Sequence, residues 1–86
     1  MPWSVVYSPS SEKFLSKLEH NISHAIFKKI RQAKENPHHY FERLTDLPYY
    51  DLRVGDYRVI ADLQDKVQII AVVKIGHRKN VYFRPI

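Results

Sequence analysis

The sequence of 86 residues contains no cysteine and only two glycines. Without cysteine the chain cannot form a disulfide or a thiolate zinc site, which suits a reducing cytosol. Two glycines are too few for nucleotide-binding folds whose loops use glycine to cradle phosphates. No apolar run approaches the length that spans a bilayer, and the N-terminus lacks a charged region followed by an apolar stretch. We therefore expect a soluble, cytoplasmic protein with no membrane partner.

Acidic residues are also in deficit. Nine Asp and Glu stand against 14 Lys and Arg, which gives a formal net charge of +5. Such an excess favours a polyanionic partner when the cations gather in one place. With 44% apolar and 27% charged residues the chain is globular rather than disordered. Its length predicts a single domain over residues 1–86.

No motif in the chain indicates a metal or a cofactor. His20 and His24 are four residues apart but have no Glu between them and no evident third ligand, and the pair His38-His39 is no stronger. The sequence also lacks the G-x-S-x-G motif, a glycine loop for phosphates and paired carboxylates at a catalytic spacing. We therefore expect neither a metal nor a cofactor.

The N-terminal part predicts a strand and a first helix. Residues 3–8 form the strand, with three apolar side chains on one face: Trp3, Val5 and Tyr7. Ser8 then offers a hydroxyl N-cap, and Pro9 suits the first helical position. A helix is therefore expected to begin here and to end near residue 21.

A second helix is expected from about residue 22 to residue 35. Its apolar residues recur at helical spacing, while its basic residues lie mostly away from that stripe. Asn36-Pro37 ends it. The two helices are expected to form an antiparallel hairpin that packs on a sheet. Residues 37–48 are bounded by prolines and lack a clean period, so we expect a loop there.

The C-terminal half predicts three antiparallel strands, because the apolar period becomes two from Tyr49 onward. Gly55-Asp56 supplies a two-residue turn with glycine first, so the first hairpin places Arg53 opposite Arg58. Opposed like charges are unfavourable for the stability of a sheet. The predicted fold is α+β: an N-terminal strand, a two-helix hairpin and a three-strand antiparallel meander in one sheet, with the helices on one face.

The second hairpin is expected to place Leu63 opposite Val67, because this register keeps the core face continuous. Lys74 then lies across from Asp56, on the same face as both arginines of the first hairpin. Arg78 follows the last strand and emerges at the same end of the sheet. Four basic residues from three strands are thus predicted to converge.

Two interpretations of this convergence remain open. In the first, the cations lie on a solvated face and pair with Asp51, Asp56 or a carboxylate of the tail. In the second, they hold the phosphates of a nucleic acid. An apolar floor beside the charges favours the second interpretation, since a base can lie against it. Its expected members are Ile60, Ile70 and Val72.

RNA cleavage through its own 2′-hydroxyl is the chemistry that such a site supports without a metal. It needs a group that takes the hydroxyl proton, cations that stabilise the phosphorane, and a proton for the leaving 5′-oxygen. Tyr82 is the candidate phenol in this cationic neighbourhood; otherwise its ring caps the edge of the sheet. His77 is a candidate proton donor or simply an exposed histidine beside a glycine.

The order of elements, together with the motifs Y-x-L-R-V-G-D-Y-R-V-I and V-x-x-I-G-H-R-K-N-V-Y, resembles the RelE/ParE toxin superfamily over essentially the whole chain. The likeness is greater to its RelE branch. It implies the toxin of a type II toxin–antitoxin system, namely a ribosome-dependent endoribonuclease (an mRNA interferase) that cleaves messenger RNA in the A site and inhibits translation. It also implies a small acidic RelB-like antitoxin that neutralises the toxin and through which alone the toxin reaches operator DNA.

The resemblance assigns roles to individual residues. It implies that Arg58 stabilises the transition state, that Arg78 acts as or assists the general acid, and that Tyr82 is the base. Arg53 corresponds to one of two alternating basic residues that bind the scissile region. Further candidates for contact with RNA are Lys74, His77 and Lys79.

Two departures from the family pattern concern this site. Asp51 occupies the first of the two alternating basic positions. Tyr82 is also closer to Arg78 than in the best-known enzyme of the family. His77 and Lys74 are therefore alternatives for the base.

Two other functions remain open. One is a ParE-like toxin that binds and poisons DNA gyrase without cleaving RNA, although the ending G-H-R-K-N-V-Y argues against it. The other is an inactive partner that binds the antitoxin and operator DNA but has lost its activity.

Overall fold

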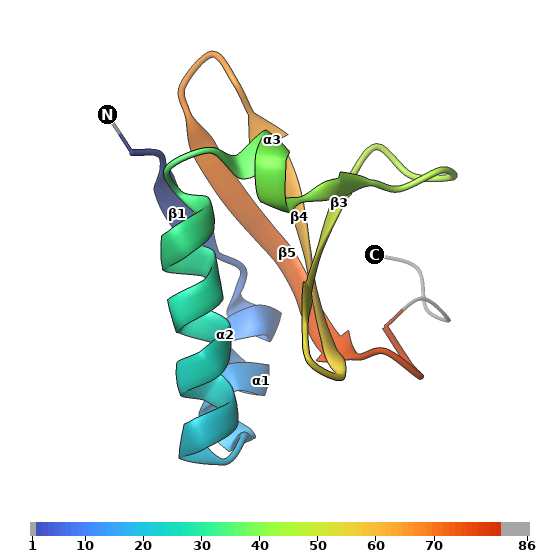
Figure 1. Cartoon of the computed structure of the whole chain (residues 1–86). Helices are drawn as coiled ribbons and strands as arrows, with labels where there is room; N and C mark the ends of the chain where they lie inside the picture. Colours follow the sequence, from blue (N-terminus) through green and yellow to red (C-terminus); the bar gives the residue numbers. More distant parts are fainter. Residues whose placement is uncertain (1, 82–86) are drawn as a thin grey trace.

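The fold is one mixed sheet covered on one face by helices (Figure 1). The structure, a computed structural model, describes residues 2–81. Its elements in chain order are β1 (Ser4–Tyr7), α1 (Pro9–Lys17), α2 (His20–Ala33), α3 (Pro37–Tyr40), β2 (Glu42–Arg43), β3 (Tyr50–Val54), β4 (Tyr57–Gln64) and β5 (Ile69–His77). The sheet order is β1-β5-β4-β3-β2, with β1 parallel to β5 and all other neighbours antiparallel. The predicted α+β fold is therefore confirmed.

Ser8 joins β1 to α1 and attaches the start of the helix to the sheet. Its hydroxyl accepts a hydrogen bond from the Ser11 amide at 3.2 Å, which caps α1 as predicted, and Pro9 begins the helix. The same hydroxyl donates to the carbonyl of Val73 in β5 at 3.0 Å. The Ser8 amide donates to the carbonyl of Val72 at 2.9 Å. Ser8 therefore forms hydrogen bonds both with the first turn of α1 and with strand β5.

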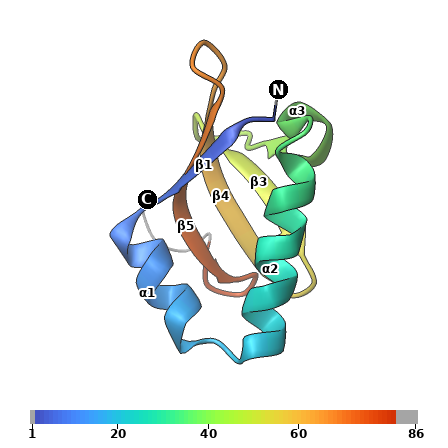
Figure 2. The same ribbon diagram turned by 90° about the vertical axis from the view of Figure 1, so that its left-hand side faces the viewer.

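The helices α1 and α2 lie side by side on the same face of the sheet (Figure 2). The first helix is shorter than expected and ends at Lys17, because Leu18 has an extended backbone (φ −79°, ψ 154°) and packs against the core. The second begins at His20, slightly earlier than expected, and ends at Ala33.

Residues 37–48 are not the plain loop that we expected. The short helix α3 starts at Pro37, and its last turn closes with a 2.8 Å hydrogen bond from the Phe41 amide to the Pro37 carbonyl. The strand β2 then adds to the edge of the sheet and places Glu42 opposite Asp51. Elements of four and two residues are too short to show a period in the sequence, so the pattern could not predict them.

The first hairpin has the predicted register. Arg53 lies opposite Arg58, and Val54 lies opposite Tyr57. Gly55 has a φ of 58°, in the left-handed region that glycine adopts without steric cost. The two-residue turn therefore fixes this pairing.

The register predicted for the second hairpin is wrong. Leu63 lies opposite Ile70 and not opposite Val67, because residues 65–68 form the turn. Ile70 is three residues beyond Val67, and an odd shift exchanges the two faces of a strand. Ile70 and Val72 therefore belong to the core under the helices rather than to an apolar floor beside the arginines.

A β-bulge in β5 restores the predicted faces near the end of this hairpin. Ile60 pairs with Lys74, whereas Ala61 pairs with Val72, so Val73 is the extra residue. Lys74 thus lies on the face expected for it. Its cross-strand neighbour is Ile60 and not Asp56, which corrects the second part of that prediction.

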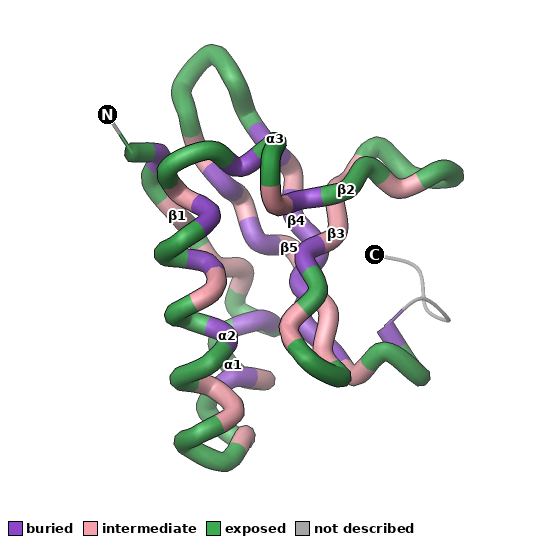
Figure 3. The backbone as a smooth tube through the Cα atoms, in the orientation of Figure 1, coloured by how far each residue is buried: buried purple, intermediate pink, exposed green. Residues whose placement is uncertain are grey.

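The core lies between the sheet and the helices α1 and α2. Buried positions recur along α2 and along the strands β3, β4 and β5 (Figure 3). Its buried members include Ile26, Ile30, Leu52, Val59 and Ile75. The predicted face of β1 is confirmed, since Trp3 is buried in this core and Val5 and Tyr7 pack against it. Within residues 2–81, no helix is both long and apolar enough to cross a membrane.

Candidate active site

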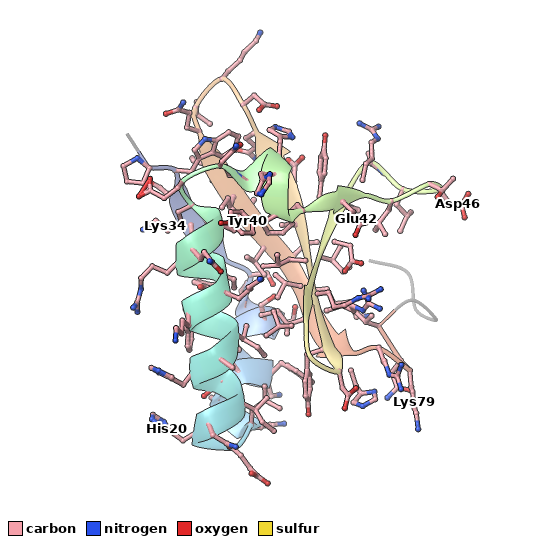
Figure 4. The ribbon with its side chains drawn as sticks, in the orientation of Figure 1. His20, Lys34, Tyr40, Glu42, Asp46 and Lys79 are labelled. Carbon is pink, nitrogen blue, oxygen red and sulfur yellow. The ribbon has the colours of Figure 1, made fainter. Side chains whose placement is uncertain are left out.

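The face of the sheet that α1 and α2 leave uncovered, termed the open face, is organised in two rows of cross-strand neighbours. The first row runs from β2 to β5 through Glu42, Asp51, Ile60 and Lys74. The second row runs from β3 to β5 through Arg53, Arg58 and Gly76. Figure 4 shows Glu42 on this side of the sheet, away from α2. Two carboxylates therefore lie beside two arginines on one surface.

Arg58 and Asp51 form an ion pair near the centre of the open face. Nη1 of Arg58 donates to Oδ2 of Asp51 at 3.2 Å, and the two side chains are only 15% and 13% exposed. The pair is incomplete, because Nε of Arg58 and Oδ1 of Asp51 are both buried without a hydrogen-bond partner among the described residues. Unsatisfied atoms in a buried ion pair cost folding free energy.

The cations next to this pair are free to bind anions. Arg53 is exposed directly opposite Arg58, and Lys74 is half-buried in the neighbouring row. Within residues 2–81, neither Arg53 nor Lys74 has a carboxylate at ion-pair distance. Ile60 between them is fully buried and is the one expected floor residue that the structure places on this face.

The chain after β5 turns over the end of the open face. The amide of Val81 donates to the carbonyl of His77 at 3.0 Å, and the side chain of Val81 is buried against Gly76. The amide of Arg78 donates to the carbonyl of Asp56 at 2.8 Å, and Nε of Arg78 lies 3.6 Å from Oδ1 of Asp56. Arg78 is therefore held at the β3–β4 turn, at the same end of the sheet as Arg53 and Arg58, as predicted.

His77 and Lys79 are placed differently from the arginines. His77 pairs with Tyr57 on the helix side of the sheet, with ring centroids 5.5 Å apart. Its Nδ1 accepts from the amide of Lys79 at 3.1 Å, so Nε2 holds the proton of the neutral ring. Lys79 is exposed beyond the end of β5 (Figure 4). Tyr82, the candidate base, lies outside the described residues.

The structure thus brings Arg53, Arg58 and Lys74 together, with Arg78 at the same end of the sheet, and it leaves His77 on the other side. The sequence analysis named Asp51 as a pairing partner of the arginines in the solvated-face interpretation, and the structure shows this pair, but it did not place Glu42 at the site. The sequence pattern places Asp51 on this face, because Asp51 alternates with Arg53 along one strand. No sequence pattern places Glu42, since β2 has only two residues.

A hollow lies on the helix side of the sheet, lined by residues of β1, α1 and α2. Its volume is about 430 Å³, and it is lined by Tyr7, Glu12, Leu15, Ser16 and Phe27. Burial raises the pKa of the Tyr7 hydroxyl, an effect partly offset by the positive charge of Arg31. The lining is mainly apolar and contains no cation, so this hollow is suited to a protein side chain and not to a phosphate.

A family of known proteins has the same sequence pattern. Residues 5–82 match the family described as the ParE toxin of the type II toxin–antitoxin system, parDE. The chain belongs to this family and is a toxin of a type II toxin–antitoxin system with the RelE/ParE fold. Recognition of the RelE/ParE toxin superfamily is therefore confirmed. None of the curated protein sequences matches the chain significantly.

Solved structures of RelE toxins share this fold. The toxin–antitoxin complex RelBE2 from Mycobacterium tuberculosis contains a chain that superposes with a TM-score of 0.83 at 20% identity, covering 91% of this chain and 100% of that one. An arginine-to-alanine double mutant of the Escherichia coli toxin RelE in the free state gives 0.78 at 21% identity, covering 94% and 88%. The archaeal RelE–RelB complex from Pyrococcus horikoshii gives 0.78 at 22% identity, covering 94% and 100%.

Proposed function

We propose that the protein is a ribosome-dependent endoribonuclease that cleaves messenger RNA in the A site by metal-independent attack of a 2′-hydroxyl. The observation that carries this proposal is the direct opposition of Arg53 and Arg58 on the open face, beside Lys74. Opposed like charges destabilise a sheet. A bound phosphate removes that cost by accepting charge-assisted hydrogen bonds from both guanidinium groups.

The residues of the open face take distinct parts in this reaction. Arg58 is nearly buried and held by Asp51, so it stabilises the phosphorane from a fixed position. Arg78 is exposed at the β3–β4 turn and assists departure of the 5′-oxygen. Arg53 and Lys74 bind flanking phosphates, and Lys79 is a further contact for RNA, whereas His77 lies on the helix side and takes no part at the open face. Tyr82 is the base that the family resemblance implies.

The partner that silences such a toxin is an antitoxin. Solved relatives include a complex of RelE with RelB. We propose that a small acidic RelB-like antitoxin buries the helix hairpin with apolar side chains, filling the hollow beside Phe27, and screens the open face with acidic ones. Operator DNA is then reached only through this antitoxin.

Inhibition of DNA gyrase is a second candidate function, because the matching family is described as the ParE toxin of parDE. A gyrase inhibitor would bind its target without cutting RNA. That function gives no chemical role to the incomplete Arg58–Asp51 pair, which is why we place it second.

The decisive experiment uses purified ribosomes with a defined message in the A site and maps cuts by primer extension. We expect wild-type toxin to cut within the A-site codon. Arg58→Ala should lower the cleavage rate by about 100-fold or more, since a preorganised charge donor contributes that much to a transition state. Lys13→Ala, a change of equal charge on the exposed side of α1, should leave the rate unchanged.

Expression of the toxin in cells, followed by analysis of messages and DNA, separates the alternatives. Intact messages together with gyrase-linked DNA breaks would replace the ribonuclease by the gyrase inhibitor. Intact messages without DNA breaks would identify an inactive partner that retains only binding to the antitoxin.

A further inference from the structure

We infer that Asp51 is the general base of this toxin, taking the proton from the attacking 2′-hydroxyl while it holds Arg58 against the phosphate. The inference rests on the proposed function and names a catalytic residue for it. It assigns to Asp51 the role that the family resemblance gives to Tyr82.

The incomplete ion pair is the observation that points to this role. Only one oxygen of Asp51 is used by Arg58, and the other, Oδ1, is a buried acceptor without a donor among the described residues. Only one nitrogen of Arg58 is used, and Nε is a buried donor without an acceptor. A bidentate contact would have satisfied both atoms, as arginine–carboxylate pairs commonly do. The pair instead leaves one acceptor and one donor without a partner among the described residues.

A ribonucleotide supplies the two complementary groups. Its 2′-hydroxyl is a donor that matches Oδ1 of Asp51, and a non-bridging oxygen of the adjacent phosphate is an acceptor that matches Nε of Arg58. The side chain of Asp51 retains 13% exposure. Oδ1 of Asp51 and Nε of Arg58 are themselves buried, so both side chains have to shift when RNA binds for these contacts to form. Deoxyribose lacks the donor, so the same site discriminates against DNA.

The reaction balances with these groups. Asp51 takes the proton of the 2′-hydroxyl, and the 2′-oxygen forms a bond to phosphorus. The bond between phosphorus and the 5′-oxygen breaks, and the leaving oxygen takes a proton from a water molecule polarised by Arg78, because a guanidinium does not release its own proton near neutral pH. The products are a 2′,3′-cyclic phosphate and a 5′-hydroxyl.

Four charged side chains face Asp51 on the open face. Glu42 on β2 is its direct cross-strand neighbour. The other three are the cations Arg53 on β3, Arg58 on β4 and Lys74 on β5.

The test measures single-turnover cleavage of the ribosome-bound message against pH. For the wild type, the rate should rise with pH at the acidic end, as a carboxylate base becomes ionised, with a slope near one on logarithmic axes. Asp51→Asn keeps an acceptor for Arg58 but cannot take a proton. It should lower the rate by about 100-fold or more and remove the acidic rise. Asp51→Glu should restore part of the rate together with the acidic rise.

Matched controls separate catalysis from folding and binding. Asp62→Asn removes a carboxylate from the same face of β4 and should leave both rate and pH profile unchanged. Thermal unfolding confirms that each variant is folded. If Asp51→Asn does not fold, the pH profiles of the cleavage rate for the wild type and Asp51→Glu decide. A rate that does not rise with pH at the acidic end in either protein would overturn the inference. Affinity for ribosomes carrying a 2′-deoxy A-site codon should change less than threefold in Asp51→Asn.

The inference and the proposed function fail in different ways. A wild-type protein that cuts no message overturns both. A wild-type protein that cuts, with Asp51→Asn cutting at a similar rate and with the same pH profile, overturns the inference alone. So does a slow Asp51→Asn that keeps the acidic rise, since Asp51 would then only position Arg58. Loss of the pH dependence in Tyr82→Phe, with Asp51→Asn normal, would return the base to Tyr82.

Discussion

At the residue scale, Gly76 controls how the segment with Arg78 lies on the open face. A Cβ atom at Gly76 would lie 3.2 Å from Cβ of Val81 and 3.3 Å from its Cγ2, which is closer than ordinary packing allows. We predict that Gly76→Ala destabilises the protein by about 1 kcal/mol through overpacking and slows cleavage by moving Arg78. Urea unfolding and the primer-extension assay measure the two effects.

The control for this prediction is a double-mutant cycle. Val81→Gly removes both the Cβ and the Cγ atoms that a new methyl group would meet, at the cost of its own lost burial. The combined variant should therefore be more stable than the sum of the two single changes predicts. Strict additivity would show that Gly76 is not constrained by Val81.

The central residues of the site differ in how far the sequence predicts their positions. Arg53 and Arg58 could be placed opposite each other because a two-residue turn leaves one register. Pairing with Asp51 was one of two interpretations that the sequence left open. The sequence could not decide which arginine forms the pair, because the contact is a diagonal across two strands and depends on side-chain rotamers. Asp51 also departs from the basic residue of the family pattern, and the structure makes it the partner of the central arginine.

At the scale of elements, Ser8 couples the start of α1 to the bulge in β5. Its hydroxyl accepts from the Ser11 amide and donates to the carbonyl of Val73. We predict that Ser8→Ala lowers the free energy of unfolding by about 1–2 kcal/mol, since a cap is lost and a part-buried carbonyl loses its donor. Ser16→Ala, an exposed serine within the same helix, should change it by less than about 0.5 kcal/mol. Urea denaturation of both variants checks this, and equal effects would refute the role of Ser8.

The bulge that Ser8 contacts also marks the limit of prediction for elements. Periodicity identified every element longer than four residues and the face of β1, because burial repeats along such lengths. Periodicity failed in β5, where one extra residue changes the alternation of the two faces. Val73 adds a residue to β5 that its alternating apolar pattern does not reveal, since both faces of this central strand are apolar there. A bulge of this kind depends on tertiary contacts, such as the hydrogen bond from Ser8, that lie 65 residues away in the chain.

At the scale of the whole molecule, two surfaces carry several of the cations that give the net charge of +5. One is the open face with Arg53, Lys74 and Arg78; the other is the outer side of α2, with Arg31 among its exposed cations. The two surfaces lie on opposite sides of the sheet (Figure 1). Net charge alone therefore does not tell which of them binds RNA, but the open face lies beside the incomplete ion pair.

Salt dependence distinguishes these two surfaces. Binding of a fluorescent 2′-O-methyl oligoribonucleotide, which cannot be cleaved through its 2′-oxygen, releases counterions in proportion to the phosphates that the protein neutralises. We predict that Arg53→Ala weakens binding and reduces the slope of log affinity against log salt by about 0.7, the value for one phosphate of a single strand. Arg31→Ala removes the same charge from α2, outside the hollow that Arg53 shares with Lys28 and Lys29, and should leave the slope unchanged. The opposite result, with the slope sensitive to Arg31 and indifferent to Arg53, would place the RNA on the helix side and separate it from the proposed active site.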